Sequence, residues 1–255
     1  MFPISISVPT RFPALVTYGL IATNVIVFLL QLGLSERADE VAVYAYGLVP
    51  ARYSNPAWAL RVGLNPNDYL PFVTNTFMHA GWLHLILNMW TLWLFGPSVE
   101  DRLGGLRYLG FYLVCGITAS GVHAWMNSDS VVPIVGASGA IAGVLGAHFR
   151  LFPLSNVVVL VPIIFIPLFF TVPSFIYIAI WFITQVFQGV GSSLMPDAGG
   201  IAWWAHIGGF IFGALFALIV RLMLRGPQTE VARWSEMYER RARGRRVPDI
   251  KPGEW

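Results

Sequence analysis

The sequence predicts an all-α, polytopic membrane protein with six transmembrane helices. Of its 255 residues, 56% are hydrophobic and 11% are charged, and the mean hydropathy is +0.65. Soluble domains carry about 25% charged residues, so this composition excludes an ordinary soluble protein. Six apolar segments approach or reach the length that a helix needs to cross the hydrocarbon core of a bilayer.

These six segments define the expected domain organisation. They cover residues 14–33, 79–96, 106–126, 137–152, 173–190 and 201–224. The first is too long for the core of a signal peptide, so we interpret it as an anchor that is retained. We expect a short cytoplasmic N-terminus at 1–13, a membrane domain at 14–224 and a basic cytoplasmic tail at 225–255. The tail is interpreted either as an amphipathic helix on anionic lipid or as a solvated segment.

A further apolar stretch, residues 156–170, is not counted as a span. Pro162 and Pro167 lie within it and disfavour a continuous helix. The stretch is also short for a transmembrane helix. We therefore expect an interfacial or re-entrant connection between the fourth and fifth spans.

The distribution of arginine and lysine predicts the orientation. With six spans, one side carries Arg11, Arg102, Arg107, Arg150, Arg221, Arg225 and the arginine-rich tail, and the other carries only Arg37, Arg52 and Arg61. The positive-inside rule then places both termini in the cytoplasm. A seventh span at 156–170 would send the arginine-rich tail to the opposite side, which favours six.

Three polar motifs lie near the starts of the second, fourth and sixth spans. They are His84-Leu-Ile-Leu-Asn88, Gly136-Ala-Ser138-Gly139 and Ala205-His206-Ile-Gly-Gly209. These spans all run from the outside inward, so the three motifs are predicted to share one depth in the outer part of the membrane. Taken singly, each motif is more often a structural polar group. Together at one depth they indicate a functional site, because polar groups in hydrocarbon are costly.

The residue types in these motifs predict nucleophilic catalysis. A serine hydroxyl needs a base to remove its proton, and His206 can serve as that base for Ser138. His84 and Asn88 are four residues apart, so they project from one helix face, and both can donate hydrogen bonds. With the Ser138 backbone N–H at a helix start, they could stabilise an oxyanion. No acidic third member lies near these residues in the sequence.

Glycines in the fourth and sixth spans favour close helix packing. Gly139 and Gly143 in one, and Gly209 and Gly213 in the other, have the small-xxx-small spacing that lets membrane helices approach backbone to backbone. Such an approach is what a Ser138–His206 hydrogen bond would need.

These motifs resemble those of the rhomboid family of intramembrane serine proteases. The similarity rests on the strings Phe77 to Met89, Phe95 to Gly104, Gly136 to Gly143 and Ala205 to Gly209, in the family's order. The resemblance implies a six-helix rhomboid-like bundle that cleaves single-span membrane proteins in or near their transmembrane helix. It also implies that Ser138 is the nucleophile, that His206 is its dyad partner, and that His84, Asn88 and the Ser138 N–H bind the oxyanion.

Further features follow from the same resemblance. Glu100 and Arg102 match a structural motif of the family, and the loop 34–70 is expected to be partly membrane-embedded. The fifth span would lie near a lateral entrance for the substrate helix. No cofactor and no metal are expected, and the partners are transmembrane-helix substrates and membrane lipid, not nucleic acid. From the short N-terminus we expect a bacterial-type plasma membrane.

One departure from the family leaves the support of His206 open. Many members carry Tyr or Phe four residues after the serine, where the ring packs on the base histidine; here that residue is Ala142. Trp203 or Trp204 could replace it. The alternative function is a catalytically inactive rhomboid-like protein that binds or escorts membrane helices. A proton channel would need a file of polar residues through the inner half of the membrane, and the sequence offers little beyond Gln185 and Gln188, both in the fifth span.

The remaining histidines and the cysteine are interpreted as structural. His79 and His123 lie near the outer face, and Cys115 is expected to be plain packing. His148 lies about three turns below Ser138, too deep to reach it, and is predicted to be a residue of the cytoplasmic interface.

Overall fold

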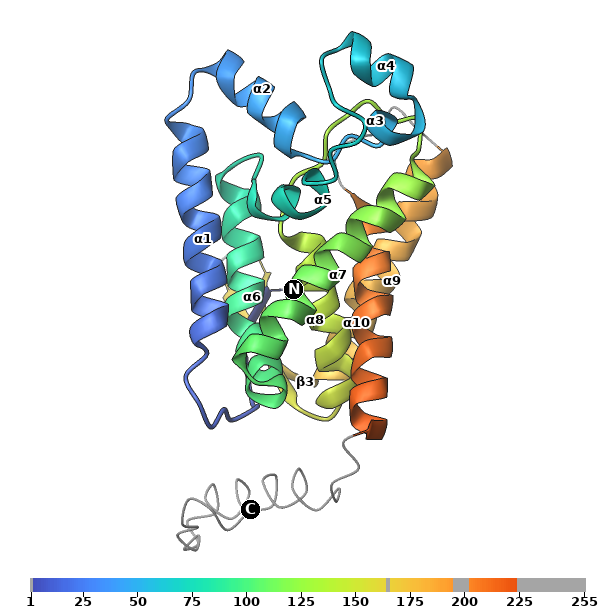
Figure 1. Cartoon of the computed structure of the whole chain (residues 1–255). Helices are drawn as coiled ribbons and strands as arrows, with labels where there is room; N and C mark the ends of the chain where they lie inside the picture. Colours follow the sequence, from blue (N-terminus) through green and yellow to red (C-terminus); the bar gives the residue numbers. More distant parts are fainter. Residues whose placement is uncertain (1, 164–165, 195–201, 224–255) are drawn as a thin grey trace, which may run out of the picture. The chain divides into compact units, whose positions relative to one another are not determined.

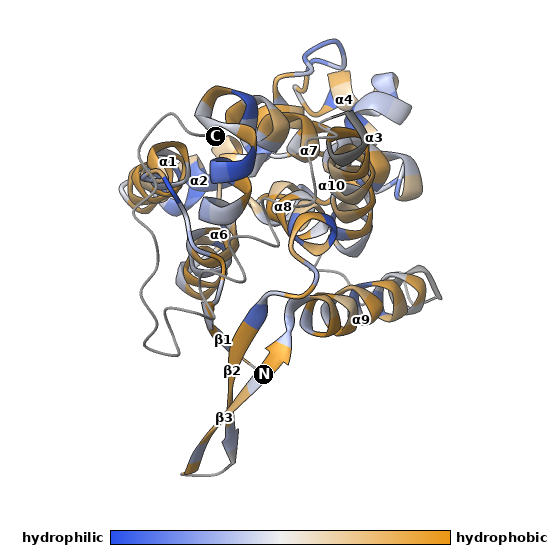
Figure 2. Cartoon of the chain, turned by 90° about the horizontal axis from the view of Figure 1, so that it is seen from below, coloured by the Kyte–Doolittle hydropathy of each residue, from blue (hydrophilic) through white to orange (hydrophobic). Residues whose placement is uncertain are grey.

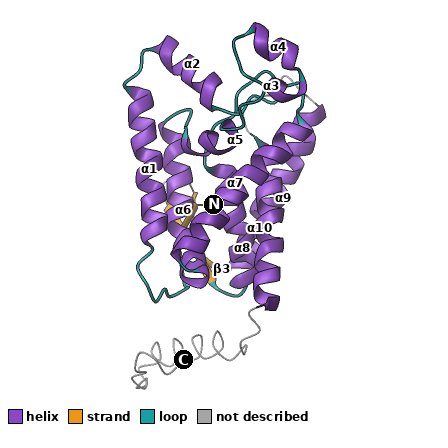
Figure 3. Cartoon of the chain, in the orientation of Figure 1, coloured by secondary structure: helices purple, strands orange, loops and turns teal. Residues whose placement is uncertain are grey.

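The computed structural model describes residues 2–163, 166–194 and 202–223, and these are mostly helical (Figures 1 and 3). The chain divides into two compact units, Met1–Leu218 and Ile219–Trp255. All the residues of the candidate site lie in the first unit. The predicted basic tail at 225–255 lies outside the described residues.

Six longer helices occupy the positions of the six predicted spans. They are α1 (Leu15–Leu32), α6 (Trp82–Leu103), α7 (Gly105–Met126), α8 (Ser138–Leu151), α9 (Ser174–Leu194) and α10 (Trp203–Met223). Among the described residues, four of them, α1, α7, α9 and α10, are long and apolar enough to cross a membrane. The other two differ for physical reasons: α8 has only 14 residues, and α6 carries polar side chains such as His84 and Asn88.

A buried carboxylate holds the start of α1 against α6. Glu100 is 5% exposed, and its Oε1 accepts the Val16 N–H at 2.9 Å. Its Oε2 accepts the N–H and the hydroxyl of Thr17, both at 2.7 Å. A carboxylate suits this place because the first N–H groups of a helix have no partner within the helix and carry partial positive charge. These contacts support the structural role expected for Glu100.

Short helices fill the segment between α1 and α6. They are α2 (Glu36–Tyr46), α3 (Ala51–Ser54), α4 (Pro56–Arg61), α5 (Pro71–Thr74) and the 3₁₀ helix η1 (Asn75–Phe77). Figure 1 shows α2, α3 and α4 near one end of the long helices. Within this segment Arg52 is buried and donates to Asp68 at 2.9 Å and to the backbone oxygens of Asn65 and Ala45.

This segment also supports the loop that leads into α8. Leu48 and Ile134 exchange backbone hydrogen bonds of 3.0 and 2.9 Å. The Gly136 N–H donates to the backbone oxygen of Asn75 at 2.8 Å. The chain before Ser138 is therefore held on two sides by residues far away in the sequence.

A three-stranded antiparallel sheet corrects the all-α prediction. The strands are β1 (Phe2–Ile6), β2 (Asn156–Ile163) and β3 (Ile166–Pro173), in the order β1-β2-β3. Runs of valine, isoleucine and phenylalanine favour strands. Pro162 and Pro167 face each other in the β2–β3 register, where they leave a ladder position without N–H donors.

The sheet lies beside two of the long helices. The hairpin of β2 and β3 projects beside α6 and α9 (Figure 2), and Trp90 Nε1 donates to the Pro3 oxygen of β1 at 2.7 Å. The expectation that 156–170 is not a helical span is confirmed. Its interfacial or re-entrant position stays a prediction, as does the membrane embedding of 34–70.

Helices α8 and α10 touch backbone to backbone, as the glycine spacing predicts. A β-carbon on Gly209 would overlap the Gly139 carbonyl oxygen, and one on Gly213 would overlap the Gly143 carbonyl oxygen. Only glycine at these two positions of α10 permits this approach. The packing sets the distance between the first turns of the two helices.

Candidate active site

Ser138 and His206 meet at the starts of two adjacent helices. Ser138 is the first residue of α8 and is partly exposed, and His206 lies in the first turn of α10, with 9% of its surface exposed. His206 Nε2 lies 2.7 Å from Ser138 Oγ, within hydrogen-bond distance. The structure thus brings together two residues that are 68 positions apart.

His84 and Asn88 lie beside the loop that precedes Ser138. A β-carbon built on Gly136 would lie 2.6 Å from His84 Cε1, 2.8 Å from His84 Nε2 and 3.7 Å from Asn88 Nδ2. Gly136 also has a φ of +132°, which L side chains rarely adopt. The glycine therefore allows both an unusual backbone conformation and the close approach of His84.

The side-chain amide of Asn88 is a buried donor available to a ligand. Asn88 is 8% exposed, and its Nδ2 has no hydrogen-bond partner among the described residues. An unsatisfied buried donor costs about 1–3 kcal/mol, so it calls for an explanation. Ser138, at the start of α8, adds a backbone N–H from a helical turn that cannot satisfy it internally. The arrangement is suited to binding negative charge beside Ser138 Oγ.

The group that supports His206 is Gln185 of α9, which the sequence reasoning did not assign to the site. His206 Nδ1 lies 2.7 Å from Gln185 Oε1, on the side of the ring away from Ser138. Trp181 and Trp203 also contact the imidazole, with ring centroids 6.1 and 6.0 Å away, and Trp203 stands edge-on to it. The sequence feature that could have identified Gln185 was its uncharged amide in a span of mostly apolar residues.

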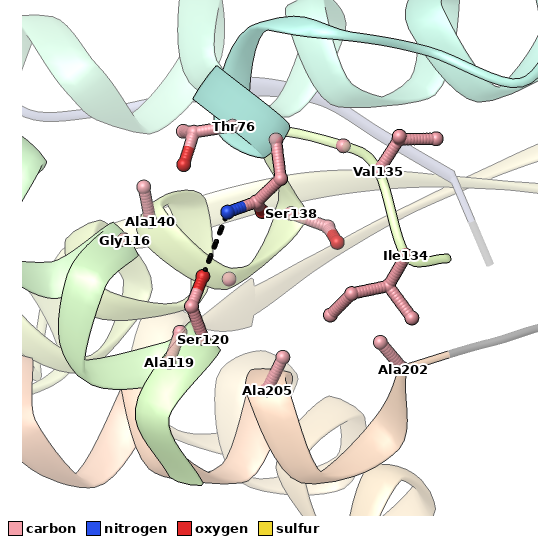
Figure 4. A pocket seen from close by; sticks show the side chains of 13 residues that line it. Thr76, Gly116, Ala119, Ser120, Ile134, Val135, Ser138, Ala140, Ala202 and Ala205 are labelled. Carbon is pink, nitrogen blue, oxygen red and sulfur yellow. Dashed lines mark hydrogen bonds between the residues drawn. The ribbon is translucent and has the colours of Figure 1, made fainter. Parts of the chain in front are cut away.

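A small pocket opens next to Ser138 (Figure 4). Its volume is about 10 Å³. Most of its lining residues are small: Gly116, Ala119, Gly136, Gly139, Ala140, Ala202 and Ala205. Asn75, Thr76 and Ser120 add polar groups, and the Asn75 side-chain amide donates to Ser120 Oγ at 3.0 Å. A group that enters beside Ser138 on this side must be small.

His148 is buried inside the bundle, and its predicted depth at the cytoplasmic interface stays a prediction. It is fully buried, with Nδ1 2.9 Å from Ser98 Oγ and Nε2 3.3 Å from the hydroxyls of both Ser155 and Ser174. It therefore joins α6 and α8 to the start of α9. The low exposure follows because three hydroxyl groups satisfy the imidazole inside the bundle.

His79 and His123 are buried near the candidate site but take no part in the Ser138–His206 pair. The His79 ring stands edge-on to His84, with centroids 5.1 Å apart, and the backbone N–H of His79 donates to Gln31 Oε1 at 3.0 Å. Within the part of the chain that the structure describes, no three His, Cys, Asp or Glu residues are grouped to hold a metal ion. The expectation of no metal and no cofactor stays a prediction.

Comparison with curated proteins finds mitochondrial rhomboid relatives. The chain is 31% identical over 152 residues to Rhomboid protein 1, mitochondrial, of Saccharomyces cerevisiae, which covers 58% of this chain and 40% of the relative. It is 28% identical over 229 residues to the bovine Presenilin-associated rhomboid-like protein, mitochondrial, covering 86% and 52%. It is 30% identical over 184 residues to RHOMBOID-like protein 6, mitochondrial, of Arabidopsis thaliana, covering 71% and 53%.

These matches bear on both the extent and the location of the chain. The chain spans about half the length of the curated relatives it matches, or less. The relatives are named as mitochondrial proteins, which conflicts with the bacterial-type plasma membrane expected from the sequence. The part of this expectation that the findings support is a membrane protein with several apolar helices.

A family model supplies the last comparison. The model described as Rhomboid domain matches residues 66–223, which is more than half of the chain and includes Ser138, His206, His84 and Asn88. The motifs that the sequence placed at one depth all lie inside this match. The chain belongs to the rhomboid family.

Proposed function

We propose that this chain is an intramembrane serine endopeptidase that cleaves single-span membrane proteins in or near their transmembrane helix. The observation that carries the proposal is the 2.7 Å contact between Ser138 Oγ and His206 Nε2 at the starts of two apolar helices. Rhomboid proteins are generally intramembrane serine proteases. This chain retains both members of the Ser–His dyad.

The reaction begins with the proton of Ser138. His206 Nε2 accepts the hydroxyl proton while Oγ attacks the carbonyl carbon of the substrate. The carbonyl oxygen becomes an oxyanion, which the Ser138 N–H and the side chains of His84 and Asn88 would stabilise by hydrogen bonds. When the tetrahedral intermediate collapses, His206 returns the proton to the leaving amine.

Hydrolysis of the acyl-enzyme completes the cycle. His206 accepts a proton from water as the water oxygen attacks the ester carbon, and the proton then returns to Ser138 Oγ as the new carboxyl end leaves. The residues of the chain supply every proton transfer in this path. The proposal requires no cofactor and no metal.

The position of the dyad limits how a substrate can bind. A peptide carbonyl within an intact helix is already hydrogen-bonded to an amide, so the substrate must unwind before its carbonyl reaches Ser138. The arginine distribution supports cytoplasmic termini and an active site toward the outer side. Exposed apolar side chains such as Leu29, Phe187 and Leu215 are suited to contact lipid.

Cleavage in proteoliposomes tests the function. The full chain, with Ser138→Ala and His206→Ala variants, is given a single-span substrate labelled on both sides of its membrane helix. We expect cleavage by the wild type and loss of cleavage in both variants. Ser98→Ala is the matched control, since it also removes a serine hydroxyl from a histidine partner but lies at His148; it should retain cleavage.

A second readout separates an unsuitable substrate from an inactive protein. A fluorophosphonate probe should label the wild type and Ser98→Ala but not Ser138→Ala, because the probe reacts with an activated serine. A folded wild type that neither cleaves a panel of substrates nor reacts with the probe would contradict the proposal. That result would favour the alternative, a catalytically inactive protein that binds or escorts membrane helices.

A further inference from the structure

Three helices contribute side chains to one continuous hydrogen-bonded chain. Ser138 of α8 lies 2.7 Å from His206 of α10, and the other nitrogen of the same imidazole lies 2.7 Å from Gln185 Oε1 of α9. Gln185 and His206 are 6% and 9% exposed. The amide is therefore buried against the imidazole on the side opposite the serine.

The neighbours of Gln185 fix which end of its amide faces His206. Gln185 Nε2 donates to the Trp181 backbone oxygen at 3.2 Å and to Thr184 Oγ1 at 3.1 Å. The Thr184 hydroxyl gives its own proton to the same Trp181 oxygen at 2.6 Å and accepts from Gln185. A flipped amide would place Oε1 against the Trp181 carbonyl oxygen, which can only accept. The network therefore assigns Oε1 to the histidine side.

This orientation determines the tautomer of His206. An amide oxygen accepts hydrogen bonds and cannot donate them, so the proton of the neutral imidazole must be on Nδ1. The lone pair is then on Nε2, which faces Ser138 Oγ. The opposite tautomer would place two acceptors together at Gln185 and would leave Nε2 unable to take the serine proton.

We infer that Gln185 is a positioning residue for catalysis, which holds His206 in the tautomer and orientation that a general base requires. The inference rests on the proposed protease function. In Ser-His-Asp triads a carboxylate has this role, and in papain-like Cys-His-Asn sites an amide has it. An uncharged amide suits a site inside apolar helices, where an unpaired carboxylate would be costly to bury. Gln185 also supports His206 in a chain where Ala142 stands in place of the aromatic residue that packs on the base histidine in many family members.

Three variants test the inference kinetically. Gln185→Leu removes the acceptor, Gln185→Glu keeps an oxygen there, and Gln188→Leu is the matched control because Gln188 is an exposed glutamine of the same helix. For Gln185→Leu we expect kcat to fall by about 10²–10⁴-fold, as in triads whose third member is changed. KM should stay within about threefold, since no substrate contact is lost. Gln185→Glu should recover kcat to within about tenfold of the wild type.

The ring nitrogens of His206 give a readout that does not depend on activity. Full-length protein with ¹⁵N-labelled histidine is studied by NMR at about pH 8, above the ordinary histidine pKa. The His206→Ala variant identifies the His206 signals among the five histidines. We expect the proton on Nδ1 in the wild type and in Gln188→Leu. Gln185→Leu should show it on Nε2 or distributed over both nitrogens.

The outcomes separate this inference from the proposed function. A wild-type His206 with its proton on Nε2 would overturn the inference, as would full kcat in Gln185→Leu, while Ser138→Ala could still lack activity. An inactive wild type with the expected tautomer change in Gln185→Leu would overturn the protease function and with it any catalytic role for Gln185. If Gln185→Leu does not fold, the wild-type tautomer and the kcat of Gln185→Glu decide.

Discussion

The carbonyl oxygen of Gly139 occupies the position that a β-carbon of Gly209 would take. Gly139 follows Ser138 directly on α8, and Gly209 is one turn beyond His206 on α10. A close approach of the two helix backbones therefore lies next to the Ser138–His206 pair, and a second one lies about one turn further along, between Gly143 and Gly213. Small residues make such an approach possible in membrane helices, and here the approach sets the distance between Ser138 Oγ and His206 Nε2.

Gly209→Ala should separate α8 from α10 and impair cleavage. The added methyl overlaps backbone, which cannot turn aside as a flexible side chain could, so we expect a loss of about 1–3 kcal/mol in stability and a clear fall in kcat. Thermal unfolding and proteoliposome cleavage measure the two effects. Gly110→Ala is the control, because a β-carbon there has no neighbour within 4 Å. Equal behaviour of the two variants would contradict the role assigned to this contact.

Gly136→Ala should abolish cleavage through His84. A β-carbon at Gly136 would lie 2.8 Å from His84 Nε2, and the φ of +132° is unfavourable for alanine. Gly63→Ala is a control for backbone strain alone, because Gly63 has a φ of +82° but open space around its β-carbon position. We expect both variants to lose about 1–2 kcal/mol of stability. Only Gly136→Ala should lose activity, and cleavage by Gly136→Ala at the rate of Gly63→Ala would refute this.

The meeting of Ser138 and His206 could be predicted from sequence because two simple rules set it. The arginine distribution predicted the direction of each span, and that direction predicted that the three motifs share one depth. The contact between Gln185 and His206 could not be predicted in this way. In a span as apolar as α9, hydropathy predicts how deep a side chain lies in the membrane, but it does not predict which neighbouring helix that side chain contacts.

The sheet was missed for a different reason. The apolar run of β2 and β3 gives no period that separates a strand from a buried helix, and only Pro162 and Pro167 indicated that a helix was disfavoured. The pairing of β1 with β2 joins Phe2 to Leu160. No local pattern in either segment specifies a partner so far away in the sequence.

Asn88→Ala should lower catalysis more than it lowers stability. The amide Nδ2 has no hydrogen-bond partner among the described residues, so removing this donor breaks no hydrogen bond that it makes there. If it stabilises the oxyanion, kcat should fall by about 10–1000-fold with little change in KM. Asn24→Ala is a useful comparison, since Asn24 is a buried asparagine whose amide donates to the Leu20 oxygen at 2.8 Å. That variant should lose stability, and a similar fall in kcat for both would argue against an oxyanion role.

The pocket beside Ser138 should make the proposed protease selective for a small side chain next to the scissile bond. The pocket lined by Gly116, Ala119, Ala140 and Ala205 has room for about one water-sized group, so a methyl fits but a large side chain would displace helix backbone. Substrates that differ only at the residue before the cleaved bond should show kcat/KM higher by about 10–100-fold for alanine or glycine than for leucine or phenylalanine, since overpacking costs about 1–3 kcal/mol. The same exchange several residues away serves as the control. Equal rates for alanine and phenylalanine would show that the side chain before the cleaved bond binds elsewhere. This pocket would then not determine substrate specificity.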